Sequence, residues 1–409
     1  MKNGGESNTA ALCRPARARS RPGPRPRLVA VTEPTDHTQV VVIGAGQAGL
    51  SVAYYLRRLG LDPGDDFVIL DRGPDAGGAW QHRWPSLRIG TAHRISDLPG
   101  MDEVGLSFET ADRSLPAKDV VAAYYRRYEE HYDLQVVRPA DVTSVVNHGA
   151  DLLTAFTDRD GDVLTLASEI VVSATGTWGA PFIPYYPGRD EFAGRQLHTA
   201  DFVRAEDFAG ARVVVVGGGT SAMGFMLELE PFASELTLVS RRPIDWVDET
   251  QDANLEGRIE AVAKQDEAAR AGRALPSIVS GTGIPRSRRV QQGIERGLLV
   301  AQPMFSRIEP HGVRWDPGVR ADGVEYAEAD AILWATGFRP ELRHLAPLRL
   351  RESSGGIVVA MGAVWKDPRV FFAGYGPQAS TIGANRAGRF VARQVVASLT
   401  RIKAARTRV

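Results

Sequence analysis

Two stretches of the chain show the same order of apolar and polar positions. In the first, residues 40–43 are a continuous apolar run, residues 50–59 place apolar side chains at helical spacing, and residues 67–70 are a second apolar run. Continuous apolar runs are typical of strands buried on both faces of a parallel sheet, and spacings of three and four residues are typical of an amphipathic helix. The first stretch therefore predicts a β-α-β unit.

The second stretch repeats this order further along the chain. It predicts a strand at 213–216, a helix that ends near residue 229 and a strand at 236–240. Strands that alternate with helices favour an α/β fold. We therefore expect two dinucleotide-binding units of similar topology and unrelated sequence.

The remaining elements lie between and after these two units. Between them we expect a helix at 119–132, an antiparallel meander at 134–137, 141–146, 152–157 and 163–166, and a separate buried strand at 170–174. After the second unit we expect a helix at 253–271, strands at 331–333 and 370–373, and a C-terminal helix from 380 to about 401.

Composition limits the class of protein. The 409 residues are 43% hydrophobic with a formal net charge of zero, which allows two or three compact units and gives no reason to expect nucleic acid as a partner. No run of about 18 apolar residues predicts a membrane span, and we expect a cytoplasmic protein. Residues 1–37 are rich in arginine and proline and are expected to be a disordered tail. Cys13 is the one cysteine, so this sequence offers no redox disulfide pair, and we expect no metal site.

A glycine-rich turn follows the first predicted strand. Gly44 suits a tight turn, Gly46 allows a diphosphate to approach the backbone, and Gly49 allows the helix to pack on the strand. Asp71 ends the second strand of this unit, where a carboxylate accepts hydrogen bonds from an adenosine ribose and repels a 2′-phosphate. The first unit is therefore expected to bind FAD or NAD rather than NADP.

The second unit has its own glycine turn with a different charge at its end. Gly217 and Gly219 lie in the turn, and Thr220 follows them. Arg241 takes the place that Asp71 has in the first unit, and a guanidinium suits a ribose 2′-phosphate. We expect NADPH here, although a merely solvated arginine explains the same residue.

Other small-residue turns stand where cofactors could lie. Gly78 and Trp80 follow the first unit and could border a flat ring, although, taken alone, they are better explained by a turn with a core tryptophan. Thr175 and Thr336 lie in two Ala-Thr-Gly turns that each follow a predicted buried strand. Gly374 follows the last strand and precedes the C-terminal helix, whose N-terminus could point at a flavin or a diphosphate.

The segment between the two units completes a recognisable combination. Phe192, Gly194, His198 and Phe202 match the pattern FxGxxxHxxxF. Together with a glycine turn on either side, this segment resembles the linker of the class B flavin-dependent monooxygenases. The resemblance covers roughly residues 38–400.

The resemblance implies an FAD domain interrupted by an NADPH domain. We expect FAD-binding parts at 38–205 and 330–402 and an NADPH-binding part at 206–329. It implies NADPH-dependent transfer of one oxygen atom from a C4a-flavin hydroperoxide to a small organic substrate, with O₂ as co-substrate. His198 and Trp80 are the catalytic candidates, and a hydrogen-bonded, orienting histidine is the simpler interpretation. The oligomeric state is left open. The residues expected to hold cofactors are Gly44, Gly46, Gly49, Asp71, Gly78, Thr175, Gly217, Gly219, Thr220, Arg241, Thr336 and Gly374.

Departures from the family pattern favour some of the family's reactions over others. Phe202 stands where Baeyer-Villiger enzymes usually have tryptophan, so N- or S-oxygenation is favoured. Tyr375 stands where the family usually has an aspartate. Two alternatives stay open: an FAD- and NADPH-dependent electron-transfer reductase, and a nucleotide-binding redox sensor without turnover.

Overall fold

The computed structural model describes residues 36–93, 95–248, 255–276, 283–360, 362–379 and 381–407. The expected disordered tail lies outside these residues as far as residue 35, whereas Asp36 and His37 begin the first strand. None of the helices in these ranges combines the length and the apolar character needed to cross a membrane.

The larger sheet has eight strands and carries the first predicted unit. Its central strands are parallel, in the order β17-β5-β1-β2, and β16 and β15 extend it beyond β17. The meander strands β3 and β4 join it through β4, which pairs with β5. The strands are β1 (Asp36–Ile43), β2 (Phe67–Leu70), β3 (Asp141–His148), β4 (Asp151–Thr157), β5 (Val163–Ser173), β15 (Val359–Ala360), β16 (Ala363–Val364) and β17 (Val370–Phe372).

Two expected strands differ in the structure. Residues 134–137 form no strand, and only Val137 makes a single bridge, to Leu70. The other difference concerns β5. Residues 163–166 and 170–174 were expected to be two strands, but residues 163–173 form one strand. Its first half pairs antiparallel with β4 and its second half pairs parallel with β1. The polar residues Ser168 and Glu169, which lie between the two expected strands, are both buried within the one strand. One strand therefore serves both the meander and the parallel sheet.

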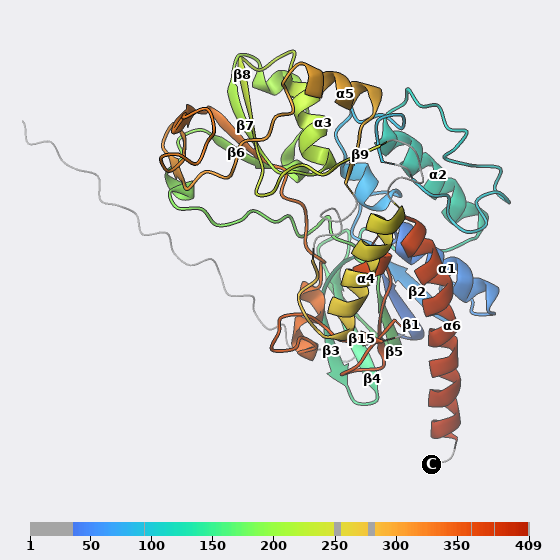
Figure 1. The fold of residues 1–409 in the computed structure, drawn as a ribbon. Helices are drawn as coiled ribbons and strands as arrows, with labels where there is room; N and C mark the ends of the chain where they lie inside the picture. The colour runs from blue at the N-terminus through green and yellow to red at the C-terminus, as the bar shows by residue number, and fades with distance from the viewer. Residues whose placement is uncertain are drawn as a thin grey trace, which may run out of the picture. The chain divides into compact units, whose positions relative to one another are not determined.

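Two helices pack together beside the larger sheet. α1 (Gln47–Arg58) and α6 (Thr381–Arg406) lie side by side (Figure 1). A Cβ atom at Gly388 of α6 would lie 2.5 Å from the Cβ atom of Ser51, so glycine is required for this close approach. α2 (Ala117–His131) contributes Tyr125 and Tyr128 to the same core.

The smaller sheet has four parallel strands in the order β6-β14-β7-β8 and carries the second predicted unit. α3 follows β7, as expected. The elements of this part are β6 (Arg195–His198), β7 (Arg212–Val216), α3 (Thr220–Leu229), β8 (Glu235–Val239), β9 (Trp246–Val247), β10 (Ile284–Pro285), α5 (Arg288–Glu295), β11 (Arg307–Glu309), β12 (Gly312–Arg314), β13 (Tyr326–Glu328) and β14 (Ala331–Trp334). α4 (Leu255–Arg270) follows β9 in the sequence but packs against β15 of the larger sheet. The short 3-10 helices are η1 (Gly78–His82), η2 (Arg189–Glu191), η3 (Thr199–Asp201), η4 (Ala205–Phe208), η6 (Arg343–Leu348) and η7 (Gly376–Gln378).

Sheet membership differs from the expected domain boundaries at two strands. β6 and β14 both pair within the smaller sheet, although they fall in segments expected to belong to the FAD domain. The strand before the second Ala-Thr-Gly turn looks like the end of the strand before the first, because residues 170–172 and 331–334 are both apolar and buried. Such a pattern identifies a buried strand without identifying its sheet.

Candidate functional site

The first glycine turn joins β1 to α1 and admits no side chain at Gly44 or Gly49. Gly44 has φ of +102°, and a Cβ atom there would lie 2.7 Å from the carbonyl oxygen of Ala174. A Cβ atom at Gly49 would lie 1.7 Å from the carbonyl oxygen of Gly44. Both glycines therefore hold the helix against the carboxyl end of the sheet, as expected from the sequence.

Next to this turn, two glycines form an open cradle. A Cβ atom at Gly78 would lie 2.7 Å from the Cα atom of Gly46, whereas one at Gly46 would have no atom closer than 3.9 Å. No described side chain caps α1, and its first turn has no acidic residue. Its N-terminal N–H groups are thus suited to an anion, and the cradle fits the diphosphate of a dinucleotide.

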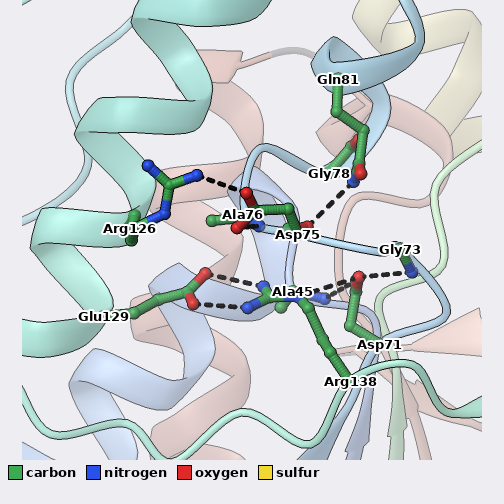
Figure 2. A network of polar contacts seen from close by, with 10 residues as sticks. All are labelled: Ala45, Asp71, Gly73, Asp75, Ala76, Gly78, Gln81, Arg126, Glu129 and Arg138. Atoms are coloured by element: carbon green, nitrogen blue, oxygen red, sulfur yellow. Dashed lines mark hydrogen bonds and ion pairs between the residues drawn. The ribbon is translucent and has the colours of Figure 1, made fainter. Parts of the chain in front are cut away.

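Two further expected residues lie beside this turn. Gly374, with φ of +74°, would bring a Cβ atom within 3.0 Å of the Cβ atom of Ala48 in the first turn of α1. Asp71 is buried, and its Oδ2 atom accepts a hydrogen bond of 2.7 Å from the backbone N–H of Ala45 (Figure 2). Its Oδ1 atom accepts one of 2.9 Å from the N–H of Gly73. Residues from four distant segments thus meet at the start of α1.

The second glycine turn repeats this geometry between β7 and α3. A Cβ atom at Gly217 would lie 2.4 Å from the carbonyl oxygen of Ala335, and Gly219 and Thr220 begin α3. Here too no described side chain caps the helix, and its first turn has no acidic residue. Arg241 is exposed just beyond β8. This turn therefore fits a second diphosphate, with the exposed guanidinium of Arg241 nearby.

The segments that link the two sheets pair with each other. We call residues 176–182 the first connector and residues 337–341 the second connector. The N–H of Phe182 donates to the carbonyl oxygen of Gly337 at 3.0 Å, and the N–H of Glu341 donates to that of Gly176 at 3.0 Å. Between them, the N–H of Arg339 donates to the carbonyl oxygen of Ala180 at 2.8 Å.

The threonines of the two Ala-Thr-Gly turns bind these connectors reciprocally. The Thr175 hydroxyl donates to the carbonyl oxygen of Glu341 in the second connector at 2.6 Å. The Thr336 hydroxyl donates to the carbonyl oxygen of Phe182 in the first connector. Both hydroxyl hydrogens are therefore used within the protein, and each threonine fixes the turn beside a glycine turn.

His198 attaches the linker segment to the same place. It is 1% exposed, its Nε2 atom donates to the carbonyl oxygen of Gly337 at 2.9 Å, and its Nδ1 atom accepts from the N–H of Ala200 at 3.2 Å. Burial lowers the pKa of His198, so the imidazole is neutral near pH 7. With both ring nitrogens bound to backbone, the geometry supports an orienting role rather than proton transfer.

A series of stacked rings runs between the two catalytic candidates. His198 meets the ring of Phe338 edge-on at 4.8 Å, and Phe338 stacks on Trp178 at 4.9 Å. The guanidinium of Arg83 lies 4.4 Å from the centre of Trp178 and 5.6 Å from that of Trp80. Burial lowers the pKa of Arg83 to about 10. Trp80, which is buried, and His198 thus lie at opposite ends of this series.

Sequence reasoning missed the middle of this series. Trp178 and Phe338 each follow an Ala-Thr-Gly turn within two residues. An aromatic residue close behind each of these turns was the sequence pattern that could have indicated them. Arg83 carried none, because a single arginine in a polar loop does not indicate burial between two indole rings.

Trp84 is a second residue whose role the sequence did not reveal. It belongs to the loop after η1, yet its ring packs with Phe202 at 5.7 Å and with Phe225 of α3 at 4.9 Å. Its Nε1 atom donates to Glu228 of α3 at 3.1 Å. Trp84 therefore fastens the loop beside the first glycine turn to the helix of the second.

Several known proteins are similar to this chain in sequence or in fold. Residues 41–271 match the family described as pyridine nucleotide-disulphide oxidoreductase. A solved flavin-containing monooxygenase from Stenotrophomonas maltophilia is 34% identical, with a TM-score of 0.70 over 89% of this chain and 99% of that chain. A Baeyer-Villiger monooxygenase from Streptomyces coelicolor is 29% identical over 54% of this chain and 41% of that protein. Senecionine N-oxygenase from Tyria jacobaeae is 27% identical over 50% of this chain and 47% of that protein.

The chain covers different shares of these relatives. The chain spans about half the length of the curated relatives it matches, but it covers nearly all of the Stenotrophomonas structure. The disulphide in the family description has no counterpart pair in this sequence, whose one cysteine is Cys13. The chain belongs to the pyridine nucleotide-disulphide oxidoreductase family and, within it, to the class B flavin-dependent monooxygenases, whose cofactors are FAD and NADPH.

Proposed function

We propose that this chain is an FAD- and NADPH-dependent monooxygenase that oxygenates the nitrogen or sulfur of a small organic substrate. The observation that carries the proposal is the pair of uncapped helix N-termini of α1 and α3. Each follows a glycine turn at the carboxyl end of a parallel sheet, and the paired connectors tie the two turns together. This arrangement supports two dinucleotides in fixed relation to each other.

FAD is assigned to the first turn. Gly44, Gly46, Gly49 and Gly78 would surround its diphosphate, and Asp71 would accept a hydrogen bond from the adenosine ribose. Gly374 would border it from the last strand. Thr175 would hold the adjoining turn through its bond to the second connector rather than by direct contact.

NADPH is assigned to the second turn. Gly217 and Gly219 would allow its diphosphate to approach the N-terminus of α3, and Thr220 would contribute a hydroxyl beside it. Arg241 would pair with the 2′-phosphate. Thr336 would hold the adjoining turn in place, as Thr175 does for the first.

The chemistry itself belongs to the flavin. Bound FAD would supply the redox chemistry, which is reduction by the hydride of NADPH and transfer of one oxygen atom of O₂ to the substrate, with the other oxygen atom released as water. The chain must hold the two cofactors in register and keep water out. His198 would orient the linker through its bond to Gly337, and Trp80 would border the flavin side of the site.

The choice of substrate atom rests on the linker. Phe202 packs between Phe208 and Phe225 beside Trp84, and this position is a phenylalanine rather than the tryptophan usual in Baeyer-Villiger enzymes. The relatives include a Baeyer-Villiger monooxygenase and an N-oxygenase. We favour nitrogen and sulfur. A panel of matched amines, sulfides and ketones, assayed for oxygenated product, tests that preference.

The function is tested by a stopped-flow experiment. The bound flavin is reduced with NADPH without oxygen, mixed with oxygenated buffer and followed by its absorption spectrum. A blue-shifted flavin spectrum that persists before reoxidation is the expected result. Direct return to the oxidised spectrum would favour an electron-transfer reductase, and bound FAD without NADPH oxidation would favour a redox sensor.

A further inference from the structure

The carboxylate of Asp71 is held from three sides. Besides the N–H groups of Ala45 and Gly73, the Nε atom of Arg138 donates to its Oδ1 atom at 3.3 Å. Figure 2 shows these three donors converging on one side chain. The Asp71 side chain is only 9% exposed, so its orientation is set by these partners rather than by solvent.

Arg138 is itself held by a second buried carboxylate. Its Nη1 and Nη2 atoms donate to the two carboxylate oxygens of Glu129 at 2.6 and 2.7 Å. Glu129 lies on α2, and the side chains of Arg138 and Glu129 are 12% and 11% exposed. A two-pronged contact fixes the plane of a guanidinium as well as its position. Glu129 therefore aims the Nε atom of Arg138 at Asp71.

The charges of this network suit a ribose and disfavour a phosphate. One guanidinium is shared by two carboxylates, so the group keeps one net negative charge. The Oδ2 atom of Asp71 accepts a hydrogen bond from Ala45 and retains a lone pair for a hydroxyl donor. An added 2′-phosphate would meet a net negative charge, which is the discrimination an FAD site requires.

We propose that Arg138 and Glu129 are positioning residues that hold Asp71 ready for the adenosine ribose of FAD. The inference rests on the proposed binding of FAD at the first glycine turn. Removal of the Glu129 charge leaves Arg138 without its two-pronged partner, and removal of Arg138 leaves two buried carboxylates close together. In either case Asp71 loses the orientation that favours the ribose hydroxyl.

The chain offers a matched control on the same helix. Arg126 of α2 forms an ion pair with Asp75, in the loop that follows Asp71 (Figure 2). This pair also joins α2 to that loop, but its side chains are 47% and 54% exposed. Exposed ion pairs contribute little to stability. The substitution Arg126→Gln therefore removes an α2 contact without disturbing Asp71.

The test compares FAD with an analogue that carries 2′-deoxyadenosine. Deflavinated protein is titrated with each ligand, and the dissociation constants are measured by flavin fluorescence for the wild type and for the variants Glu129→Gln, Arg138→Met, Arg138→Lys and Arg126→Gln. We expect the wild type and Arg126→Gln to prefer FAD about tenfold, as one hydrogen bond to a charged acceptor implies. Glu129→Gln and Arg138→Met should bind FAD more weakly and lose that preference, and Arg138→Lys should recover part of it.

Each other outcome contradicts the proposal. A variant that binds both ligands more weakly but keeps the preference would show a structural role only, and unchanged FAD binding would remove both residues from the site. If Glu129→Gln fails to fold, the double variant Glu129→Gln/Arg138→Met removes the buried charges together and must still lose the preference. A wild type that binds no FAD would overturn the proposed function as well, whereas a wild type that binds FAD and variants that discriminate as it does would overturn only this inference.

Discussion

The substitution Gly49→Ala tests the packing of the first glycine turn. The added Cβ atom would lie 1.7 Å from the carbonyl oxygen of Gly44, and both positions are backbone that no side-chain rotation relieves. The helix α1 has to move away from the turn by roughly 1 Å or more, and overpacking of this kind destabilises by about 1–3 kcal/mol or more. The movement also separates the turn from Gly78.

Gly224→Ala is the matched control. Gly224 lies inside α3, and a Cβ atom there has no other atom within 4 Å. Alanine is favoured over glycine in a helix by about 0.8–1.0 kcal/mol. The same substitution is therefore expected to stabilise the second unit and to destabilise the first.

The assay is the amount of FAD bound per chain, from flavin absorbance, together with the unfolding temperature. We expect Gly49→Ala to lose most of its FAD and to unfold several degrees below the wild type, with Gly224→Ala at or above the wild type. Full flavin content and an unchanged unfolding temperature for Gly49→Ala would refute the close contact between α1 and the turn.

Three further predictions concern other parts of the site. Trp84→Ala should lower the free energy of unfolding by about 3–5 kcal/mol, because a buried ring between Phe202 and Phe225 is removed. Denaturant titration measures this free energy, and a loss below about 1 kcal/mol would contradict the packing of Trp84. Burial lowers the pKa of His344 to about 4, so as the pH falls from 6.5 to 4 the unfolded chain binds a proton before the folded chain does, and stability should fall. The denaturant midpoints at pH 7 and pH 5 should differ less in His344→Gln than in the wild type. An equal difference in the two proteins would exclude this histidine as the cause. Arg241→Ala should raise KM for NADPH about tenfold or more and leave KM for NADH unchanged, and steady-state kinetics showing an equal rise for both would place Arg241 away from the 2′-phosphate.

Much of the candidate site could be predicted because local rules govern it. Gly44, Gly46 and Gly49 follow a buried strand and begin a helix, and the structure places them together as expected. The second turn with Gly217 and Gly219 follows the same rule. Such turns can be recognised from the spacing of glycines and apolar residues within about 30 residues, since the strand, the turn and the helix are neighbours in sequence as well as in space.

Contacts between distant segments could not be predicted in this way. Thr175 and Thr336 looked like cofactor residues, but their hydroxyls bind the connectors. Arg138 and Glu129 carry no motif, because an ion pair leaves no periodic trace in a sequence. The sheet of β14 was expected to be that of the FAD domain, but β14 pairs with β6 and β7, since an apolar strand pairs with whichever edge the chain path brings to it.

The sequence by itself determined the two β-α-β units, their glycine turns and the opposite charges of Asp71 and Arg241. Apolar periodicity and the steric freedom of glycine act locally, so they can be read without coordinates. Only the tertiary structure decided that Arg138 and Glu129 lie beside Asp71 and that the two connectors pair with each other. The physical reason is that the space around a side chain is set by segments far away in the chain, and close packing allows no adjustment.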